Sequence, residues 1–487
     1  MTVTEEPTGR TRAPKTVLTL LLFGVGAALP YAVPSLGRFR FVRDGELAVI
    51  VTQVPRVPLV RRIEPEGRER TVRPAEEPRP AVIAESRTGD AGGRPVAAAR
   101  PRDRSIEPLV DADVSIEDEA EGLNAFFASL QRTERREPGA VTRISHFGDS
   151  PLTGDLISGE ARVRLQRAYG DAGHGFVLAG RPWGWYGHNG VTLTASGWKP
   201  LSPLLTWGDG GLHGLGAVSF VGNGSGRSEI ALDGGTFTHL EVTFLTRPGG
   251  GHLLVSVDDG PPAEIDSNGP VSREGHFTLH LPKEARRVVL RSKGDGPVSV
   301  HGVVLERDGP GIVYDALGAN GAAVHSLTLL NAEGWIQSLA ARRSDLVILN
   351  YGTNESGYEG VPGTSYRKDW IEVIGRVRKA LPGASILLMS PMDRGMRRED
   401  GAIVTFPSIP RIVEAQRSIA AETGCAFFDT FSAMGGEGTM ARWYDREPRL
   451  VSADFTHTTK GGSDRVARLL VGALEEAYRE WQGENVK

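Results

Sequence analysis

The chain has 487 residues, more than one ordinary domain needs, and its length predicts two or three units. Its 56 lysine and arginine residues stand against 60 aspartate and glutamate residues, for a formal net charge of −4, so the basic surface of a nucleic-acid-binding protein is not expected. The 62 glycine and 31 proline residues indicate many turns and at least one β-rich or linker segment.

The N-terminal residues 1–40 are predicted to be a signal peptide or a membrane anchor. Residues 16–37 carry no charge, and basic residues precede them between positions 10 and 15. A basic flank before an apolar run of this length is typical of such segments, and a buried core helix is a weaker alternative because nothing nearby would cover it. We therefore expect export to the periplasm or the extracellular space, with the protein either released or held at the cytoplasmic membrane.

A charged linker is expected to follow. Residues 64–104 consist mainly of proline, arginine, glutamate, alanine and glycine, with few large apolar side chains. This composition cannot bury a core, so residues 41–105 are predicted to be disordered.

Two parts of the chain, 106–184 and 307–487, alternate apolar strands with amphipathic helices. Strands are expected at 141–147, 311–316, 345–351, 386–390 and 426–428, and helices at 117–132, 155–168, 366–380, 409–422 and 461–481. Strands that are apolar throughout and alternate with helices predict an α/β fold, with a parallel sheet covered by helices on both faces.

The intervening residues 185–306 have a different pattern. Alternating apolar stretches at 239–244, 253–257 and 298–305 are separated by glycine-rich turns, and convincing helical periodicity is absent. This pattern predicts a β-sandwich inserted into the α/β domain.

Four short segments combine residues suited to acyl transfer. They are Gly148-Asp149-Ser150, Gly318-Ala319-Asn320-Gly321, Gly352-Thr353-Asn354 and Asp454-Phe455-Thr456-His457. Each lies where a predicted strand ends, and ligands of open α/β sheets bind beyond the carboxyl ends of the strands. We therefore expect the four segments to meet at one site.

The residue types in these segments suggest their roles. A serine hydroxyl needs a neighbouring base to act as a nucleophile, and His457 is the best candidate to activate Ser150. Asp454, three residues before His457, would bind the other ring nitrogen and fix its tautomer. The N–H groups of Ser150 and Gly321 and the side-chain amide of Asn354 would hold an oxyanion.

Other polar residues near the site have competing interpretations. Asp149 is more simply a support for the loop that presents the serine, and His146 is expected to be a structural partner. Asp429 ends a strand and is an alternative orienting acid, but it lacks the close spacing of Asp454 to the histidine. His174 lies in a glycine-rich loop and is a candidate substrate-binding residue.

The single cysteine, Cys425, excludes an intrachain disulfide and lies in an apolar run that predicts a buried strand. The cysteine and histidine residues do not have the spacing of metal ligands. A serine mechanism requires neither a metal nor an organic cofactor, so none is expected.

On these residues the sequence resembles the SGNH hydrolases, also called GDSL esterases. The matching residues are Ser150 for the first block of the family, Gly321 for the second, Asn354 for the third, and Asp454 with His457 for the fifth. Gly321 is preferred to Gly318 because the family's glycine usually ends such a loop. The resemblance covers residues 140–182 and 311–480 and implies a flavodoxin-like parallel sheet and serine esterase activity.

One subset of that family is more similar to this chain. Bacterial peptidoglycan O-acetylesterases and related polysaccharide deacetylating enzymes carry a sandwich similar to a carbohydrate-binding module between the first and second blocks, where residues 185–306 lie here. The segment 169–176 also resembles that group. Pro151 is a departure, because leucine or histidine is more usual after the serine.

An aromatic cluster lies where the predicted insert begins. Trp183, Trp185 and Tyr186 are candidate glycan-binding residues, because flat rings stack on sugars. The alternative, which we favour slightly, is that they seal the junction between the two domains.

The expected function is that of an exported serine esterase acting on O-acetyl groups of peptidoglycan or another cell-wall or extracellular polysaccharide. Three alternatives stay open: a lipase, arylesterase or thioesterase acting on small acyl esters, a polysaccharide O-acetyltransferase, and a non-catalytic glycan-binding protein. The complete set of candidate catalytic residues argues against the last.

Overall fold

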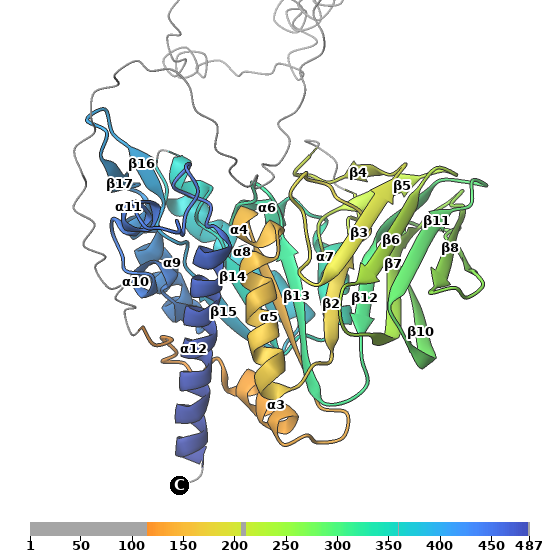
Figure 1. Cartoon of the computed structure of the whole chain (residues 1–487), viewed down its shortest axis with the longest axis horizontal. Helices are drawn as coiled ribbons and strands as arrows, with labels where there is room; N and C mark the ends of the chain where they lie inside the picture. Colours follow the sequence, from red (N-terminus) through yellow and green to blue (C-terminus); the bar gives the residue numbers. More distant parts are fainter. Residues whose placement is uncertain (1–113, 206–210, 359, 486–487) are drawn as a thin grey trace, which may run out of the picture. The chain divides into compact units, whose positions relative to one another are not determined.

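The computed structural model describes residues 114–205, 211–358 and 360–485 (Figure 1). The predicted signal or anchor at 1–40 and the predicted linker at 41–105 lie outside the described residues. Within the described ranges, no helix has both the length and the apolar character needed to cross a membrane.

A five-stranded parallel sheet forms the centre of the α/β part, in the order β13-β1-β14-β15-β18. The strands are β1 (Val141–Gly148), β13 (Gly311–Gly318), β14 (Leu346–Asn350), β15 (Ser385–Met389) and β18 (Ala426–Phe428). β14 and β15 are buried at every position, which explains why their sequences are mainly apolar and do not alternate. The prediction of a parallel sheet is confirmed.

Helices cover both faces of this sheet. On β14, Leu346 and Ile348 lie in the same apolar cluster as α3, α5 and α12, whereas Val347 and Leu349 lie with α7, α8 and α9, because successive side chains of a strand point to opposite faces. The helices are α3 (Asn124–Glu134), α5 (Leu156–Tyr169), α7 (Ala332–Arg342), α8 (Thr364–Ala380), α9 (Ile409–Thr423) and α12 (Lys460–Asn485). α12 packs along α5 (Figure 1).

The helix predicted at 117–132 is α3, which begins later than expected, at Asn124. Glu117 instead pairs with Phe427 at the edge of the sheet, and the Asp118 carboxylate accepts the N–H groups of Gly122 and Leu123. The short elements are α4 (Ser150–Thr153), α6 (Val324–Thr328), η2 (Glu355–Gly357), β16 (Gly395–Arg397), β17 (Ile403–Thr405), α10 (Thr430–Ala433) and α11 (Thr439–Tyr444).

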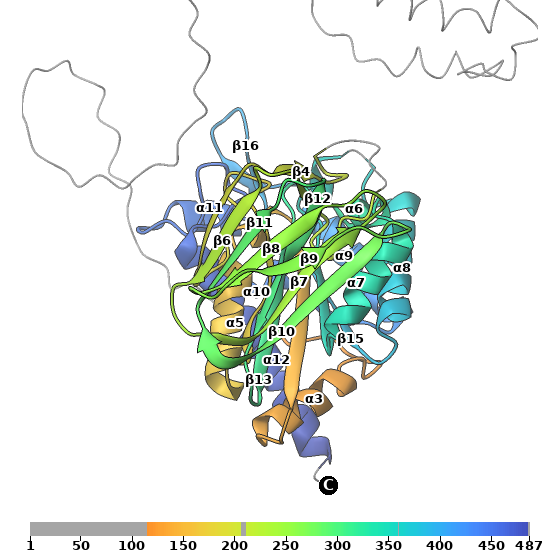
Figure 2. The same ribbon diagram turned by 90° about the vertical axis from the view of Figure 1, so that its right-hand side faces the viewer.

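Residues 173–306 form two antiparallel sheets, which face the viewer in Figure 2. One has the order β10-β7-β12-β5-β4, with β2 also paired to β12, and the other has the order β3-β6-β11-β8-β9. The strands are β2 (Gly173–Leu178), β3 (Val191–Ser196), β4 (Lys199–Leu201), β5 (Ser219–Gly222), β6 (Arg227–Leu232), β7 (Phe237–Thr246), β8 (His252–Val257), β9 (Ala263–Asp266), β10 (Arg273–Ala285), β11 (Arg287–Ser292) and β12 (Val298–Glu306). Apolar side chains of both sheets, such as Leu240 and Ile230, share one buried cluster.

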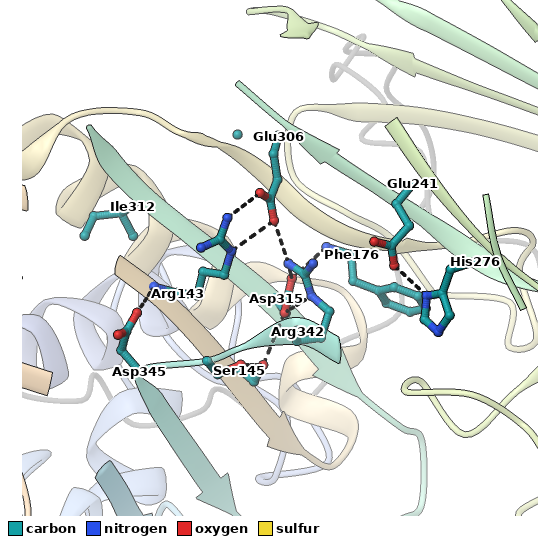
Figure 3. Close-up of polar contacts among 12 residues, drawn as sticks. Arg143, Ser145, Phe176, Glu241, His276, Glu306, Ile312, Asp315, Arg342 and Asp345 are labelled. Atoms are coloured by element: carbon teal, nitrogen blue, oxygen red, sulfur yellow. Dashed lines mark hydrogen bonds and ion pairs between the residues drawn. The ribbon is translucent and has the colours of Figure 1, made fainter. Parts of the chain in front are cut away.

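A buried ion-pair network joins the antiparallel strand β12 to the parallel sheet (Figure 3). Arg342, at the end of α7, donates through Nε to Asp315 Oδ2 over 2.8 Å, and through Nη2 to Asp315 Oδ1 and Glu306 Oε1, each over 3.0 Å. Arg143 of β1 pairs with Glu306 over 2.7 Å. Because Glu306 ends β12 and Asp315 lies in β13, one guanidinium contacts both parts of the fold.

Burial makes this network important for stability. The Asp315 side chain is 0% exposed and the Arg342 side chain is 6% exposed. Burial raises the pKa of Glu306, but the positive charges of Arg342 and Arg143 outweigh that effect and lower the pKa to about 2. Asp315 also accepts the Phe176 N–H of β2 over 2.8 Å, so it joins a fourth strand to the network, after β1, β12 and β13.

Replacing Arg342 by methionine tests this network. We expect Arg342→Met to lower the free energy of unfolding by about 3–5 kcal/mol, because it leaves Asp315 and Glu306 buried without their cation. Urea unfolding followed by tryptophan fluorescence measures the change. The matched control is Arg343→Met at the exposed neighbouring position, with an expected change within about 0.5 kcal/mol. Equal stabilities of the two variants would contradict the assigned role.

Candidate active site

Ser150, His457 and Asp454 form a continuous hydrogen-bonded series. Ser150 Oγ lies 2.8 Å from His457 Nε2, and His457 Nδ1 lies 2.7 Å from Asp454 Oδ2. Asp454 Oδ1 accepts the backbone N–H groups of Thr456 and His457, each over 3.0 Å. With the Nδ1 proton directed at the carboxylate, Nε2 can accept the proton of the serine hydroxyl.

The carboxylate of this series stays ionised in a site open to solvent. Burial raises the pKa of Asp454, but the hydrogen bonds from the His457 ring and backbone outweigh that effect and hold the pKa below its usual value. The side chains of Asp454 and His457 are 50% and 46% exposed. A bulky ester can therefore approach the imidazole directly.

Ser150 is presented by a tight turn between β1, which ends at Gly148, and α4. A β-carbon on Gly148 would lie 2.4 Å from Leu152 Cδ1 and 2.8 Å from the carbonyl oxygen of Asn350. Only glycine fits this close approach of strand and helix. Because Ser150 is the first residue of α4, its N–H has no acceptor within the helix.

The loop at 451–458 that carries His457 is closed by backbone hydrogen bonds. The Ser452 N–H donates to the carbonyl oxygen of His457 over 2.8 Å. Phe455, with φ +56, accepts the Gly395 N–H over 2.8 Å. These bonds fix the position of the loop and therefore of the His457 imidazole that faces Ser150.

The two candidate oxyanion glycines have different surroundings. Gly321 has φ +71, and a β-carbon there would meet nothing within 4 Å. In the described part of the chain, its N–H donates to no acceptor. Gly318 lies against α4, where a β-carbon would come within 2.4 Å of the backbone of Leu152. Gly318 is therefore a packing residue, and Gly321 borders open space.

Asn354 and Glu355 fasten the loops that carry these donors. Asn354 Nδ2 donates to the carbonyl oxygen of Ala322, next to Gly321, over 2.7 Å. Glu355 Oε1 accepts the Val324 N–H over 2.8 Å, and its Oε2 accepts the Gly352 N–H over 3.0 Å. One carboxyl group thus joins the loop after β13 to the loop after β14.

Two buried carboxyl groups lie close to Asn354. Asp149 Oδ2 is 3.4 Å from Asn354 Nδ2. Burial, and then the nearby charge of Glu355, raises the pKa of Asp149 to about 8, and burial raises the pKa of Glu355 to about 7. The sequence pattern indicates a supporting role for Asp149, whereas its only signal for Glu355 is adjacency to Asn354. It gives no signal for Arg394, which donates to the carbonyl oxygen of Thr353 over 3.0 Å and has no distinctive sequence context.

His146 and Asp429 have structural partners elsewhere. His146 Nδ1 lies 2.7 Å from the Tyr314 hydroxyl, and burial lowers the pKa of His146 to about 3. Asp429 caps α10 and pairs with Arg417. The carboxylate that contacts the imidazole of the site is that of Asp454.

The four candidate sugar-binding residues lie in different environments. Trp183 and Tyr186 are buried, and the Tyr186 hydroxyl accepts the Leu178 N–H over 2.9 Å. These two rings therefore offer no face to a ligand, and their assignment to a sugar platform is corrected. His174 is half-buried, and burial lowers its pKa to about 4. Trp185 is 57% exposed and retains an open ring.

A family comparison matches a range of the chain that includes most of these site residues. Residues 291–465 match the model of the GDSL-like Lipase/Acylhydrolase family, a range that includes Gly321, Asn354, Asp454 and His457 and begins after Ser150. A comparison with curated protein sequences finds no match. The resemblance to GDSL esterases inferred from the sequence is confirmed, and the family match supports a carboxylic ester hydrolase.

Among solved structures, the chain is similar to a peptidoglycan O-acetylesterase, with a TM-score of 0.64 and 24% identity over 75% of this chain and 99% of that chain. Weaker similarity is found to family two carbohydrate esterases. The one from Cellvibrio japonicus has a TM-score of 0.26 and 12% identity over 59% of this chain and 98% of that chain. The one from Clostridium thermocellum, in complex with cellohexaose, has a TM-score of 0.26 and 12% identity over 59% of this chain and 99% of that chain. The first of these likenesses supports the α/β fold with its parallel sheet.

The raised pKa of Asp149 predicts a pH dependence of stability. Its carboxyl group keeps a proton up to about pH 8 in the folded chain but loses it near its ordinary value of 3.8 in the unfolded chain. The folded state therefore binds more protons between these values, and stability from this group falls as the pH rises. We expect the free energy of unfolding to fall less steeply over this range in Asp149→Asn than in the wild type.

Urea unfolding at several pH values across this range measures the two slopes. The matched control is Asp400→Asn, which removes an exposed carboxylate. Parallel slopes for wild type and Asp149→Asn would show that Asp149 is not protonated in the folded chain.

Proposed function

We propose that this chain is an exported serine esterase that hydrolyses O-acetyl esters of a cell-wall or extracellular polysaccharide through an acyl-enzyme on Ser150. The observation that carries the proposal is the hydrogen-bonded series from Ser150 through His457 to Asp454, with distances of 2.8 and 2.7 Å. A serine hydroxyl is a weak nucleophile unless such a base accepts its proton.

In the first half of the reaction, Ser150 Oγ forms a bond to the carbonyl carbon of the acetyl ester. His457 Nε2 takes the hydroxyl proton and then gives it to the sugar oxygen, which leaves as the free alcohol. Asp454 stabilises the imidazolium that forms in between, because its ionised carboxylate lies 2.7 Å from Nδ1. The products of this half are the deacetylated sugar and an acetyl ester on the serine.

The tetrahedral intermediate places a negative charge on the former carbonyl oxygen. We assign the Ser150 N–H, the Gly321 N–H and the Asn354 side-chain amide as donors to that oxygen. The Asn354 amide donates to the carbonyl oxygen of Ala322 over 2.7 Å and to Asp149 Oδ2 over 3.4 Å, so the longer of these two bonds is the one that would be exchanged for the oxyanion. Holding Asn354 through Ala322 orients the amide before the substrate arrives.

In the second half, water replaces the sugar. His457 Nε2 takes a proton from the water as its oxygen bonds to the acetyl carbon, and the ester bond to Ser150 Oγ then breaks. The proton held by His457 returns to Ser150 Oγ, and the second proton of the water leaves with the product as acetic acid, which then ionises to acetate in solvent. No redox change occurs, and the residues named supply every proton transfer.

Three features support a polysaccharide as the substrate. The site is open to solvent at His457 and Asp454, which suits an ester on a long chain. The antiparallel sheets at 173–306 support the proposal of an inserted domain similar to a carbohydrate-binding module. The fold is similar to that of a peptidoglycan O-acetylesterase. The proposed export rests on the charge pattern of residues 1–40.

The first test is acetate release from O-acetylated peptidoglycan and from acetylated xylan by wild type and Ser150→Ala. We expect release from at least one polymer, and a loss of at least about 10³-fold in Ser150→Ala because the nucleophile is removed. Hydrolysis of p-nitrophenyl acetate is measured in parallel. Activity on this ester alone would replace the proposal with small-acyl hydrolysis or acyl transfer, and undiminished activity in Ser150→Ala would overturn the serine mechanism.

A second test concerns the oxyanion donors. We expect Asn354→Ala to lower kcat for p-nitrophenyl acetate by about 10²–10³-fold with a small change in KM, because the amide acts on the charge that develops in the transition state. Steady-state kinetics measures both constants, and circular dichroism checks that the variant is folded. A rise in KM at unchanged kcat would instead place Asn354 in substrate binding.

A further inference from the structure

Two aromatic side chains are exposed in the described part of the chain, one on the β2–β3 loop that contacts the end of α4 and one on the segment that follows Asn354. Trp185 is 57% exposed and Tyr358 is 67% exposed. Every other tryptophan, tyrosine and phenylalanine in residues 114–205, 211–358 and 360–485 is buried or half-buried. Large aromatic side chains gain free energy on leaving water, so two exposed rings beside one site indicate a ligand that covers them.

Trp185 lies next to the short helix that begins at Ser150. The Gly187 N–H donates to the carbonyl oxygen of Thr153, the last residue of α4, over 3.2 Å. A β-carbon on Gly154 would lie 3.7 Å from the carbonyl oxygen of Trp185. The backbone of Trp185 therefore packs against the end of the short helix that begins at Ser150.

The loop that carries Trp185 is fixed by buried contacts. Tyr186, the next residue, is buried, and the two residues therefore place their rings in opposite environments. Asn189, further along the loop, donates its N–H to Asp155 Oδ2 over 2.8 Å. Asp155, which precedes α5, also pairs with Arg162 over 2.8 Å. The exposed indole is thus held on a rigid support, and binding a ligand would cost little ordering entropy.

Tyr358 follows the turn that begins at Asn354. Its N–H donates to the carbonyl oxygen of Glu355 over 3.0 Å. The turn is held from outside, because Ser356 Oγ accepts from Arg394 Nη1 over 2.8 Å. Tyr358 is therefore placed four residues from the proposed oxyanion donor, on a segment that is itself tied down.

We infer that Trp185 and Tyr358 bind the faces of sugar rings that neighbour the acetylated sugar, so that the ligand of this site is a polysaccharide chain. This inference rests on the proposed esterase function and adds two residues that recognise the polysaccharide beyond the acetylated sugar. One ring lies on the β2–β3 loop, which contacts the end of α4, and the other lies four residues after Asn354, so a ligand that touches both is larger than an acetyl group. The carbon-bound hydrogens on the face of a sugar ring match a flat aromatic surface, and its hydroxyl groups stay in water.

The size of the exposed surface favours a sugar over a protein partner. A large aromatic side chain buries about 150–250 Å² at most, whereas a specific protein interface needs about 800 Å² on each partner. The remaining exposed large apolar residues are aliphatic and include Val271 and Ile371, which lie on a sandwich loop and on α8. Each of the two exposed rings is therefore large enough to stack on one sugar ring, whereas the two together are too small for a specific protein interface.

The experiment compares the polymer with a small ester in Trp185→Ala, Tyr358→Ala and the double variant. The measured quantity is kcat/KM for acetate release from O-acetylated peptidoglycan and from acetylated xylan, each divided by kcat/KM for p-nitrophenyl acetate. We expect this ratio to fall about tenfold for each single variant on the preferred polymer, mainly through KM, and further in the double variant. Trp185→Phe and Tyr358→Phe keep a ring and should retain most of the ratio.

Val271→Ala is the matched control, because Val271 is 59% exposed and lies on a loop of the antiparallel sheets. An unchanged ratio in the alanine variants, or an equal fall in Val271→Ala, would overturn the inference. A change of oligomeric state in the alanine variants, measured by size-exclusion chromatography, would also overturn it in favour of a protein interface. Failure of the esterase proposal itself would be seen separately, as undiminished hydrolysis of p-nitrophenyl acetate by Ser150→Ala.

Discussion

The hydrogen bond between Ser150 and His457 joins residues 307 positions apart in the chain, and much of the fold serves to hold that contact. Ser150 is placed by β1, which lies inside the parallel sheet between β13 and β14. His457 is placed by the loop that leads into α12, and α12 packs on α5, the helix that follows the serine turn. Since a displacement of about 1 Å is enough to impair a reaction of this kind, both supports must be rigid.

The side of the site that carries Gly321 and Asn354 depends on a different contact. Glu355 is buried, and its two oxygens accept N–H groups from the loop after β13 and the loop after β14. Burial raises the pKa of Asp149 and that of Glu355, and the nearby charge of Glu355 raises the pKa of Asp149 further, so the arrangement is unfavourable for charge at neutral pH. In return, one side chain holds together the two segments that carry Gly321 and Asn354.

The antiparallel sheets contribute to the site through their connections. The loop that carries Trp185 leaves β2 and leads into β3, so its path depends on how these strands sit beside the parallel sheet. The network around Arg342 sets that relation, because ion pairs and hydrogen bonds are directional where apolar contacts are not. This buried charge network thereby helps to position the strand from which the loop of Trp185 begins, because Asp315 also binds the backbone of β2.

The sequence by itself determined the parallel sheet and the order of polar residues at its strand ends, because apolar runs and short motifs are local patterns. Only the tertiary structure decided which distant groups share the site. Glu355 bonds to Val324, 31 positions earlier, and no periodicity links the two. In the turn at 183–186, neighbouring aromatic residues differ in exposure, with Trp185 open and Tyr186 buried. Burial and partners across separate segments follow from packing, which a local pattern does not encode.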